Sequence, residues 1–187
     1  MKVYVIRHGE SESNRDKKYT GWHDAPLTDK GREDAKKAAE LLKNVRFDQI
    51  YASDLCRAMQ TAREAIHRCT PQTSPLLREI NVGRLADLPL STLDSEERAR
   101  LTACGYADFG GESQAEFCER IRAFQKELET LSCDNVAVFA HAGWMRGMLD
   151  LVLGIRHLRS TICCNNCTVA IFEYEDATWR LHSWINL

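Results

Sequence analysis

Two uninterrupted apolar runs constrain the fold of this chain more than any other feature. Val3–Ile6 and Val136–Ala140 consist of β-prone residues without the alternation expected of a strand exposed on one face. Such strands are typical of a mostly parallel sheet that is covered on both faces. Arg7 and His8 follow the first run, and His141 follows the second. Because ligands bind beyond the carboxyl ends of parallel strands, these side chains are predicted to converge on one pocket.

Helical patterns lie between the predicted strands. Thr28 is a suitable N-cap for a helix, a strand is predicted over 47–52, and Ser53 would cap the next helix. Arg57 then falls in or beside the first turn of that helix, where free amide groups already favour anions. A capping box at 113–116 starts a long amphipathic helix.

The alternation of strands and helices predicts an α/β protein, a three-layer α/β/α sandwich with a mostly parallel central sheet. A hairpin of 168–174 and 178–185 is expected to close the chain. Residues 1–187 are expected to form a single domain, because the length suits one core and no linker is visible. The segment 84–110 is less regular, with a short helical stretch over 95–103, and could serve as a lid.

Charge and composition limit the kinds of partner. Lys and Arg number 25 against 27 Asp and Glu, so the net charge of −2 gives no global attraction for nucleic acid or anionic membranes. An anion site must therefore be built locally. The apolar stretch before Arg7 is too short for a signal-peptide core and no run reaches transmembrane length, so we expect a cytoplasmic protein.

The eight cysteines are spread over the chain and, without a secretion signal, are expected to be reduced. Cys163, Cys164 and Cys167 cluster, and the last two form a Cys-x-x-Cys pair. A closed zinc site needs four ligands, but the sequence has no second such pair and only His157 lies nearby. A redox pair more often lies at a helix start, whereas this pair leads into a predicted strand. Metal or redox chemistry is the minor alternative here, and we expect no metal and no cofactor.

Two strand-end histidines and two arginines predict a phosphate site. A histidine can attack phosphorus, and an arginine presents a planar fork of donors to phosphoryl oxygens. Three of the following five segments contain these residues: Arg7–Asn14, Thr20–Thr28, Ser53–Ala62, Gly110–Ser113 and His141–Gly143. In this order, the segments resemble the motifs of the histidine phosphatase superfamily, which includes the cofactor-dependent phosphoglycerate mutases. In size and pattern the chain is most similar to small phosphatases such as α-ribazole phosphatase.

The resemblance implies a role for each matching residue. His8 becomes phosphorylated, and a backbone carbonyl orients its other ring nitrogen. The transferring group is held by Arg7, Arg57 and His141. Glu79 matches the carboxylate that protonates the leaving oxygen and then deprotonates a water molecule. Further substrate contacts are expected from Asn14, Ser11, Thr20, Gly21, Trp22 and the backbone amide of Ala142.

Other interpretations stay open for some of these residues. Glu79 could instead be a surface glutamate paired with Arg78 or Arg84. Arg98 or Arg100, in the segment 84–110, could meet an acidic leaving group. The remaining histidines are more simply surface or packing residues: His23, His67, His157 and His182.

We therefore expect a metal-independent phosphomonoesterase that hydrolyses a small phosphorylated metabolite through a phosphohistidine. The first alternative is a phosphoglycerate mutase. The Thr20–Trp22 loop resembles those enzymes, but the insertion with adjacent, carboxylate-gripping arginines that they carry after the acid residue is missing after Glu79. The second alternative is a noncatalytic phospholigand-binding protein, which the complete set of histidines, arginines and carboxylate disfavours. The sequence leaves the physiological substrate and the oligomeric state undetermined.

Overall fold

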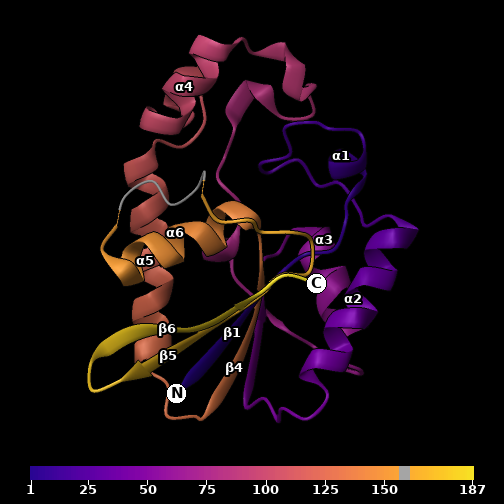
Figure 1. Ribbon diagram of the computed structural model, residues 1–187, viewed down its shortest axis with the longest axis vertical. Coiled ribbons are helices and arrows are strands. Elements are labelled where there is room, and N and C mark those ends of the chain that lie inside the picture. The colour runs from indigo at the N-terminus through magenta and orange to yellow at the C-terminus, as the bar shows by residue number, and fades with distance from the viewer. Residues whose placement is uncertain (156–160) are drawn as a thin grey trace.

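The computed structural model describes residues 1–155 and 161–187. The strands are β1 (Lys2–Arg7), β2 (Gln49–Ala52), β3 (Gln72–Thr73), β4 (Asn135–Ala140), β5 (Val169–Glu175) and β6 (Thr178–Ile185). They form one sheet in the order β3-β2-β4-β1-β5-β6. The first four strands run parallel, whereas β5 is antiparallel to β1 and to β6. The predicted mostly parallel sheet and C-terminal hairpin are confirmed (Figure 1).

Helices cover the sheet on both faces, as the apolar strands require. One face carries α2 (Asp29–Leu42) and α3 (Cys56–Ala65), and the other carries α5 (Gln114–Glu129) and α6 (Ala142–Leu153) (Figure 1). Val5 and Val138 lie in the core under α5 and α6, whereas Ile6 and Phe139 lie in the core under α2 and α3. Because successive strand residues point to opposite faces, an unbroken apolar run is what such a strand needs. The three-layer sandwich is confirmed.

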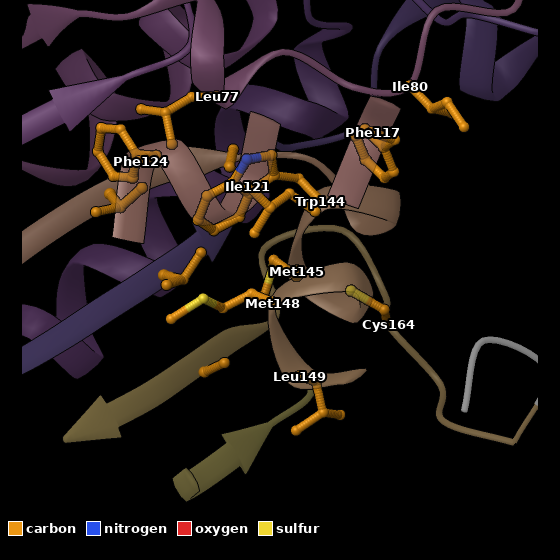
Figure 2. Close-up of a cluster of buried hydrophobic side chains, with 14 of the residues drawn as sticks. Leu77, Ile80, Phe117, Ile121, Phe124, Trp144, Met145, Met148, Leu149 and Cys164 are labelled. Atoms are coloured by element: carbon orange, nitrogen blue, oxygen red, sulfur yellow. The ribbon is translucent and has the colours of Figure 1, made fainter. Parts of the chain in front are cut away.

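The larger core lies between the sheet and helices α5 and α6 (Figure 2). The ring of Phe124 packs edge-on against Trp144, at 5.9 Å between centroids, and against Tyr51, at 5.5 Å. Burying one such large side chain contributes about 1.5–3 kcal/mol. Helix α6 packs closely against α5 at Gly147, where a Cβ atom would lie 2.4 Å from Cδ1 of Ile121. This packing fixes the start of α6, which follows β4 directly.

The strand register brings the carboxyl ends of the central strands to one level. Arg7 of β1 pairs with Ala140 of β4, and Ala52 of β2 pairs with Phe139 of β4. The backbone N–H of His8 donates to the Ala140 carbonyl at 3.0 Å, which extends the pairing of β1 with β4 by one residue. The residues after β1, β2 and β4 therefore meet at one edge of the sheet.

Most helix starts agree with the sequence, and one does not. Thr28 caps α2, and the capping box at 113–116 starts α5, as predicted. Ser53 does not cap α3, because its Oγ accepts from the backbone N–H of Leu55 at 3.3 Å and Leu55 is the N-cap. A short helix, α1 (Glu12–Arg15), lies between β1 and α2, where the sequence patterns predict no helix.

Beyond this edge the chain makes an excursion of short helices, at the top of Figure 1. They are η2 (Gly83–Leu85), η3 (Leu90–Thr92), α4 (Ser95–Cys104) and η4 (Ala107–Phe109). The backbone of Tyr19 attaches the excursion to the loop after α1, because its N–H donates to Leu88 at 2.9 Å and its carbonyl accepts from Asp87 at 2.8 Å. The helical stretch predicted over 95–103 agrees with α4. Neither α4 nor any other described helix has the length and apolarity needed to cross a membrane.

Candidate active site

The two strand-end histidines lie side by side at the carboxyl edge of the sheet. The ring centroids of His8 and His141 are 5.1 Å apart, with 62° between the ring planes, and both side chains are buried. Nδ1 of His8 lies 2.7 Å from the Gly9 carbonyl oxygen. Because a carbonyl only accepts, Nδ1 carries the hydrogen. In the neutral ring, Nε2 therefore keeps the lone pair.

Burial and nearby positive charge disfavour protonation of both rings. Burial is the main factor that lowers the pKa of His8 well below its usual value, and the charges of Arg57 and Arg7 add to it. The hydrogen bond to Gly9 acts in the opposite direction. Burial also comes first in lowering the pKa of His141, followed by the charge of Arg57. His8 is thus held in the neutral form that a nucleophile needs.

Arg57 lies in the first turn of α3, and its guanidinium is fully buried. Nη1 donates to the carbonyl of His23 at 2.9 Å, and Nη2 donates to the carbonyl of Gly21 at 2.8 Å. Burial lowers the pKa of Arg57 to about 10, while the charges of Glu79 and Asp24 act in the opposite direction. The guanidinium therefore stays positively charged at neutral pH.

Several buried nitrogen atoms of this cluster have no hydrogen-bond partner within residues 1–155 and 161–187. They are Nε of Arg7, Nε of Arg57 and both ring nitrogens of His141. Arg7 uses Nη1 to bind the carbonyl of Cys164, and burial lowers its pKa. Unpaired buried polar groups are rare because each costs about 1–3 kcal/mol. An anion bound between these side chains would accept hydrogen bonds from the two Nε–H groups and from the one ring N–H of neutral His141.

Glu79 reaches the start of α6, beside His141. Its Oε2 accepts from the backbone N–H of Gly143 at 2.9 Å, and its Oε1 accepts from that of Ile80 at 2.9 Å. A Cβ atom on Gly143 would lie 2.1 Å from Oε1, so only glycine permits this approach. Ala142, the first residue of α6, has one of the amides that a helix leaves unpaired at its start.

The contacts do not support Glu79 as a surface partner of Arg78 or Arg84. Nε of Arg78 binds the carboxylate of Asp54 at 2.7 Å. Arg84 donates to the carbonyl of Asp108 at 3.2 Å. Both arginines are thus engaged elsewhere, and the Glu79 carboxylate faces α6.

The Thr20–Trp22 loop lies against both Arg57 and Glu79. Gly21 has a φ of +49°, and a Cβ atom there would lie 2.6 Å from Cγ2 of Val82, so the close turn requires glycine. Nε1 of Trp22 donates to the backbone carbonyl of Glu79 at 2.8 Å, and Trp22 as a whole residue is 37% exposed. Thr20 closes the turn through its carbonyl. The loop thus links the arginine to the carboxylate.

Asn14 is oriented by two donors. Its Oδ1 accepts from the backbone N–H of Ser11 at 3.3 Å and from Nδ2 of Asn166 at 3.2 Å. The Ser11 hydroxyl accepts from the Asn14 N–H, which caps α1. Asn166 also donates to the carbonyl of His8 at 3.1 Å. Since Oδ1 is occupied, the Asn14 amide has its N–H groups to offer a ligand.

Sequence reasoning missed two residues that support the site, Asn166 and Thr61. The Thr61 hydroxyl accepts from the backbone N–H of Gly9 at 3.0 Å and donates to the carbonyl of Arg57 at 2.7 Å. Thr61 lies four residues after Arg57, on the same face of α3, and that spacing was a usable signal. No local pattern pointed to Asn166, because its partners, His8 and Asn14, lie near the other end of the sequence.

The cysteine cluster lies behind Arg7. The thiols of Cys164 and Cys167 are buried, and burial raises the pKa of the Cys167 thiol to about 12. All eight cysteines are free. In the described part of the chain, no three His, Cys, Asp or Glu side chains are grouped so as to hold a metal ion. His157, the other ligand considered, lies outside the described residues.

The remaining described histidines do not join the cluster. His23, His67 and His182 are exposed. The ring of His23 lies 3.8 Å from the carboxylate of Asp87. His23 binds Arg57 through its backbone carbonyl. These positions agree with the expectation that they are surface residues.

The chain as a whole matches a known family. The family model of the histidine phosphatase superfamily (branch 1) matches residues 3–187. The chain therefore belongs to the histidine phosphatase superfamily, whose enzymes act as phosphatases or mutases on small phosphorylated substrates.

Some relatives of this chain are named as mutases and others as phosphatases. A Proteus mirabilis protein named "Probable phosphoglycerate mutase GpmB" is 30% identical over 194 residues, covering 99% of this chain and 90% of that protein. The crystal structure of TTHB049 from Thermus thermophilus is similar with a TM-score of 0.79, 29% identity and full coverage of both chains. An Escherichia coli structure described as "a putative alpha-ribazole-5'-P phosphatase" gives a TM-score of 0.86 at 25% identity, covering 100% of this chain and 97% of that one.

Proposed function

We propose that this protein is a phosphomonoesterase that needs no metal ion and hydrolyses a small phosphate ester through a phosphohistidine. The observation that carries the proposal is the buried His8, whose ring hydrogen is fixed on Nδ1 by the Gly9 carbonyl. Around it lie the unpaired donors of Arg7, Arg57 and His141 described above. Such fixed donors can take the phosphoryl charge that a metal ion takes in other enzymes.

In the first step, the lone pair on Nε2 of His8 attacks phosphorus, and the bond to the leaving oxygen breaks. Glu79 gives its proton to that oxygen, so the product leaves as an alcohol. Throughout, the phosphoryl oxygens are held by Arg7, Arg57, His141, Asn14 and the backbone amide of Ala142.

In the second step, water replaces the histidine. Glu79, now a carboxylate, takes a proton from the water as its oxygen bonds to phosphorus. The N–P bond breaks, and its electron pair returns to Nε2 of His8. Inorganic phosphate leaves, and both residues are restored.

We further propose that residues 1–187 act as one domain and that the segment 84–110 covers the substrate. The arginines of this segment bind within it rather than reaching toward a ligand carboxylate. Arg84 stacks on Phe109 at 4.9 Å, Arg98 donates to the carbonyl of Leu93 at 2.7 Å, and Arg100 pairs with Asp108 at 2.6 Å. This arrangement supports hydrolysis over transfer, because a mutase must grip the substrate until the phosphate returns.

The name of the Proteus relative favours a second candidate, a phosphoglycerate mutase. Supplied with phosphoglycerate and a bisphosphate primer, the protein should release inorganic phosphate rather than move phosphate between carbons. Simultaneous assays of phosphate release and isomerisation distinguish the two. Efficient isomerisation with negligible phosphate release would make the protein a mutase.

The covalent intermediate gives the direct test. Brief reaction with a ³²P-labelled ester, stopped without acid, should leave label on His8 that is lost in acid and survives base. His8→Ala should lose the label and several orders of magnitude in rate, since the covalent route disappears. Label on serine or cysteine would contradict the assignment, and hydrolysis by His8→Ala at the wild-type rate would end it. No label and no hydrolysis with any ester would favour the noncatalytic alternative.

A further inference from the structure

Arg120, in α5, binds the backbone that carries Glu79. Its side chain is 12% exposed, and each of its five N–H groups has an acceptor. Nε and Nη2 bind the two carboxylate oxygens of Glu112, at 2.8 Å each. The other three bonds go to the carbonyls of Leu76, Arg78 and Glu79, at 2.9, 2.7 and 3.0 Å.

The segment held in this way has no regular secondary structure between η1 (Pro75–Leu77) and η2. Its carbonyls therefore lack the partners that a strand or helix would supply. Glu112 makes a second attachment, because it accepts from the backbone N–H of Asn81 at 2.8 Å and donates its own N–H to the Asn81 carbonyl at 2.9 Å. Leu77 and Ile80, on either side of residues 78–79, are buried in the core (Figure 2). Apolar packing and Arg120 thus hold the segment together.

We propose that Arg120 and Glu112 form a clamp that positions Glu79 for proton transfer, an inference that rests on the proposed role of Glu79. The Glu79 carbonyl is bound by Arg120 and Trp22, while its carboxylate is bound at Gly143. Arg120 binds the backbone of Glu79 and not its carboxylate, so Arg120 is a positioning residue. A misplacement of about 1 Å can cost a reaction about 10²-fold in rate.

The test replaces Arg120 with lysine. Arg120→Lys keeps the positive charge, whose field also acts on His141, but a single ammonium cannot bind five acceptors. With an alkyl phosphate, whose leaving oxygen needs the proton, kcat/KM should fall about 10²-fold. With p-nitrophenyl phosphate, whose leaving group departs without a proton, kcat/KM should fall less than about threefold. The ratio of the two values from one preparation does not depend on the fraction of active protein, so partial unfolding cannot imitate the result.

Two further variants sharpen this test. Arg122→Lys, on the same helix, is the matched control, because Arg122 is exposed and pairs with Glu119 at 2.7 Å, and it should leave the ratio unchanged. Glu112→Gln removes the charge that holds Arg120 and should shift the aryl-to-alkyl ratio in the same direction as Arg120→Lys.

Glu79→Gln separates failure of the clamp from failure of the proposed function. If Glu79→Gln does not raise the aryl-to-alkyl ratio, Glu79 is not the acid, and the clamp proposal is overturned with that role. If Glu79→Gln raises the ratio but Arg120→Lys and Glu112→Gln do not, the clamp alone is overturned. An equal loss with both esters in Arg120→Lys would also overturn it, since that is the effect of general loosening.

Discussion

His8 and His141 are buried beside two guanidinium groups, and this environment both permits and limits the chemistry. A protonated ring has no lone pair for phosphorus, so the surroundings that lower the pKa of His8 also preserve the lone pair that its proposed role as nucleophile requires. The pKa of His141 is lowered by the same causes. Two buried neutral histidines also make the folded state sensitive to acid, because the unfolded chain can protonate both of them.

We expect the free energy of unfolding to fall as the pH drops below about 6.5. In this range the unfolded chain takes up protons on His8 and His141 while the folded protein does not, so stability rises with pH. Each histidine can contribute a slope of up to about 1.4 kcal/mol per pH unit. Urea unfolding in phosphate-free buffers from about pH 7.5 to pH 5.5 measures the slope. His141→Gln should make it shallower, and an unchanged slope in that variant would contradict the prediction.

Helix α6 connects the fold with the candidate site more directly than any other described element. It begins where β4 ends, which places His141, Ala142 and the amide of Gly143 at the edge of the sheet. Two of its glycines lie at close approaches to different partners. Gly143 faces the Glu79 carboxylate, whereas Gly147 faces Ile121 in the core.

Alanine at these two glycines should separate activity from stability. Gly143→Ala should displace the Glu79 carboxylate, since the new Cβ would lie 2.1 Å from Oε1, and so lower kcat/KM about 10²-fold for alkyl phosphates. Gly147→Ala should lower the free energy of unfolding by about 1–3 kcal/mol, because Ile121 must move in a packed core. Steady-state kinetics and thermal unfolding of both variants check this. Equal effects of the two substitutions on activity would argue against it.

Local patterns predicted the elements and the convergence of His8 and His141, whereas the other long-range contacts of the site could not be predicted. The apolar runs gave β1 and β4, and the caps at Thr28 and 113–116 gave two helix starts. The prediction that Ser53 caps α3 was wrong, because a serine before a helix can bind within the preceding turn instead of capping the helix. Arg120 binds the carbonyls of Arg78 and Glu79, about 40 residues earlier in the chain. This contact depends on tertiary packing, for which a single sequence carries no periodic signal.

The whole molecule is nearly neutral, with a net charge of −2, although the candidate site gathers two arginines. Its attraction for an anion is therefore local and comes from donors that folding leaves unpaired within the described chain. At about 0.1 M salt, charges beyond about 10 Å are largely screened, so distant surface lysines add little. Phosphate binding should thus depend on the cluster itself.

Activity should survive removal of metal ions, because in the proposed mechanism cationic side chains take the charge of the phosphoryl group. Dialysis against a chelator, followed by assay with p-nitrophenyl phosphate, should give the rate of the untreated protein. Vanadate, which adopts the geometry of the transfer, should inhibit. Loss of activity on dialysis with recovery on adding zinc would contradict this prediction and direct attention back to Cys164 and Cys167.

Cys163 and Cys164 are neighbours in the chain, yet the first thiol is exposed and the second is buried. The carbonyl of Cys164 is also the group that Arg7 binds. We therefore expect the Cys164 thiol to become accessible when the segment 163–167 moves away from Arg7. The rate at which an alkylating reagent modifies Cys164, divided by its rate at Cys163, therefore reports the fraction of molecules in which this part is open. The chain contains its own chemical probe for the equilibrium between the closed and open forms of this part of the molecule.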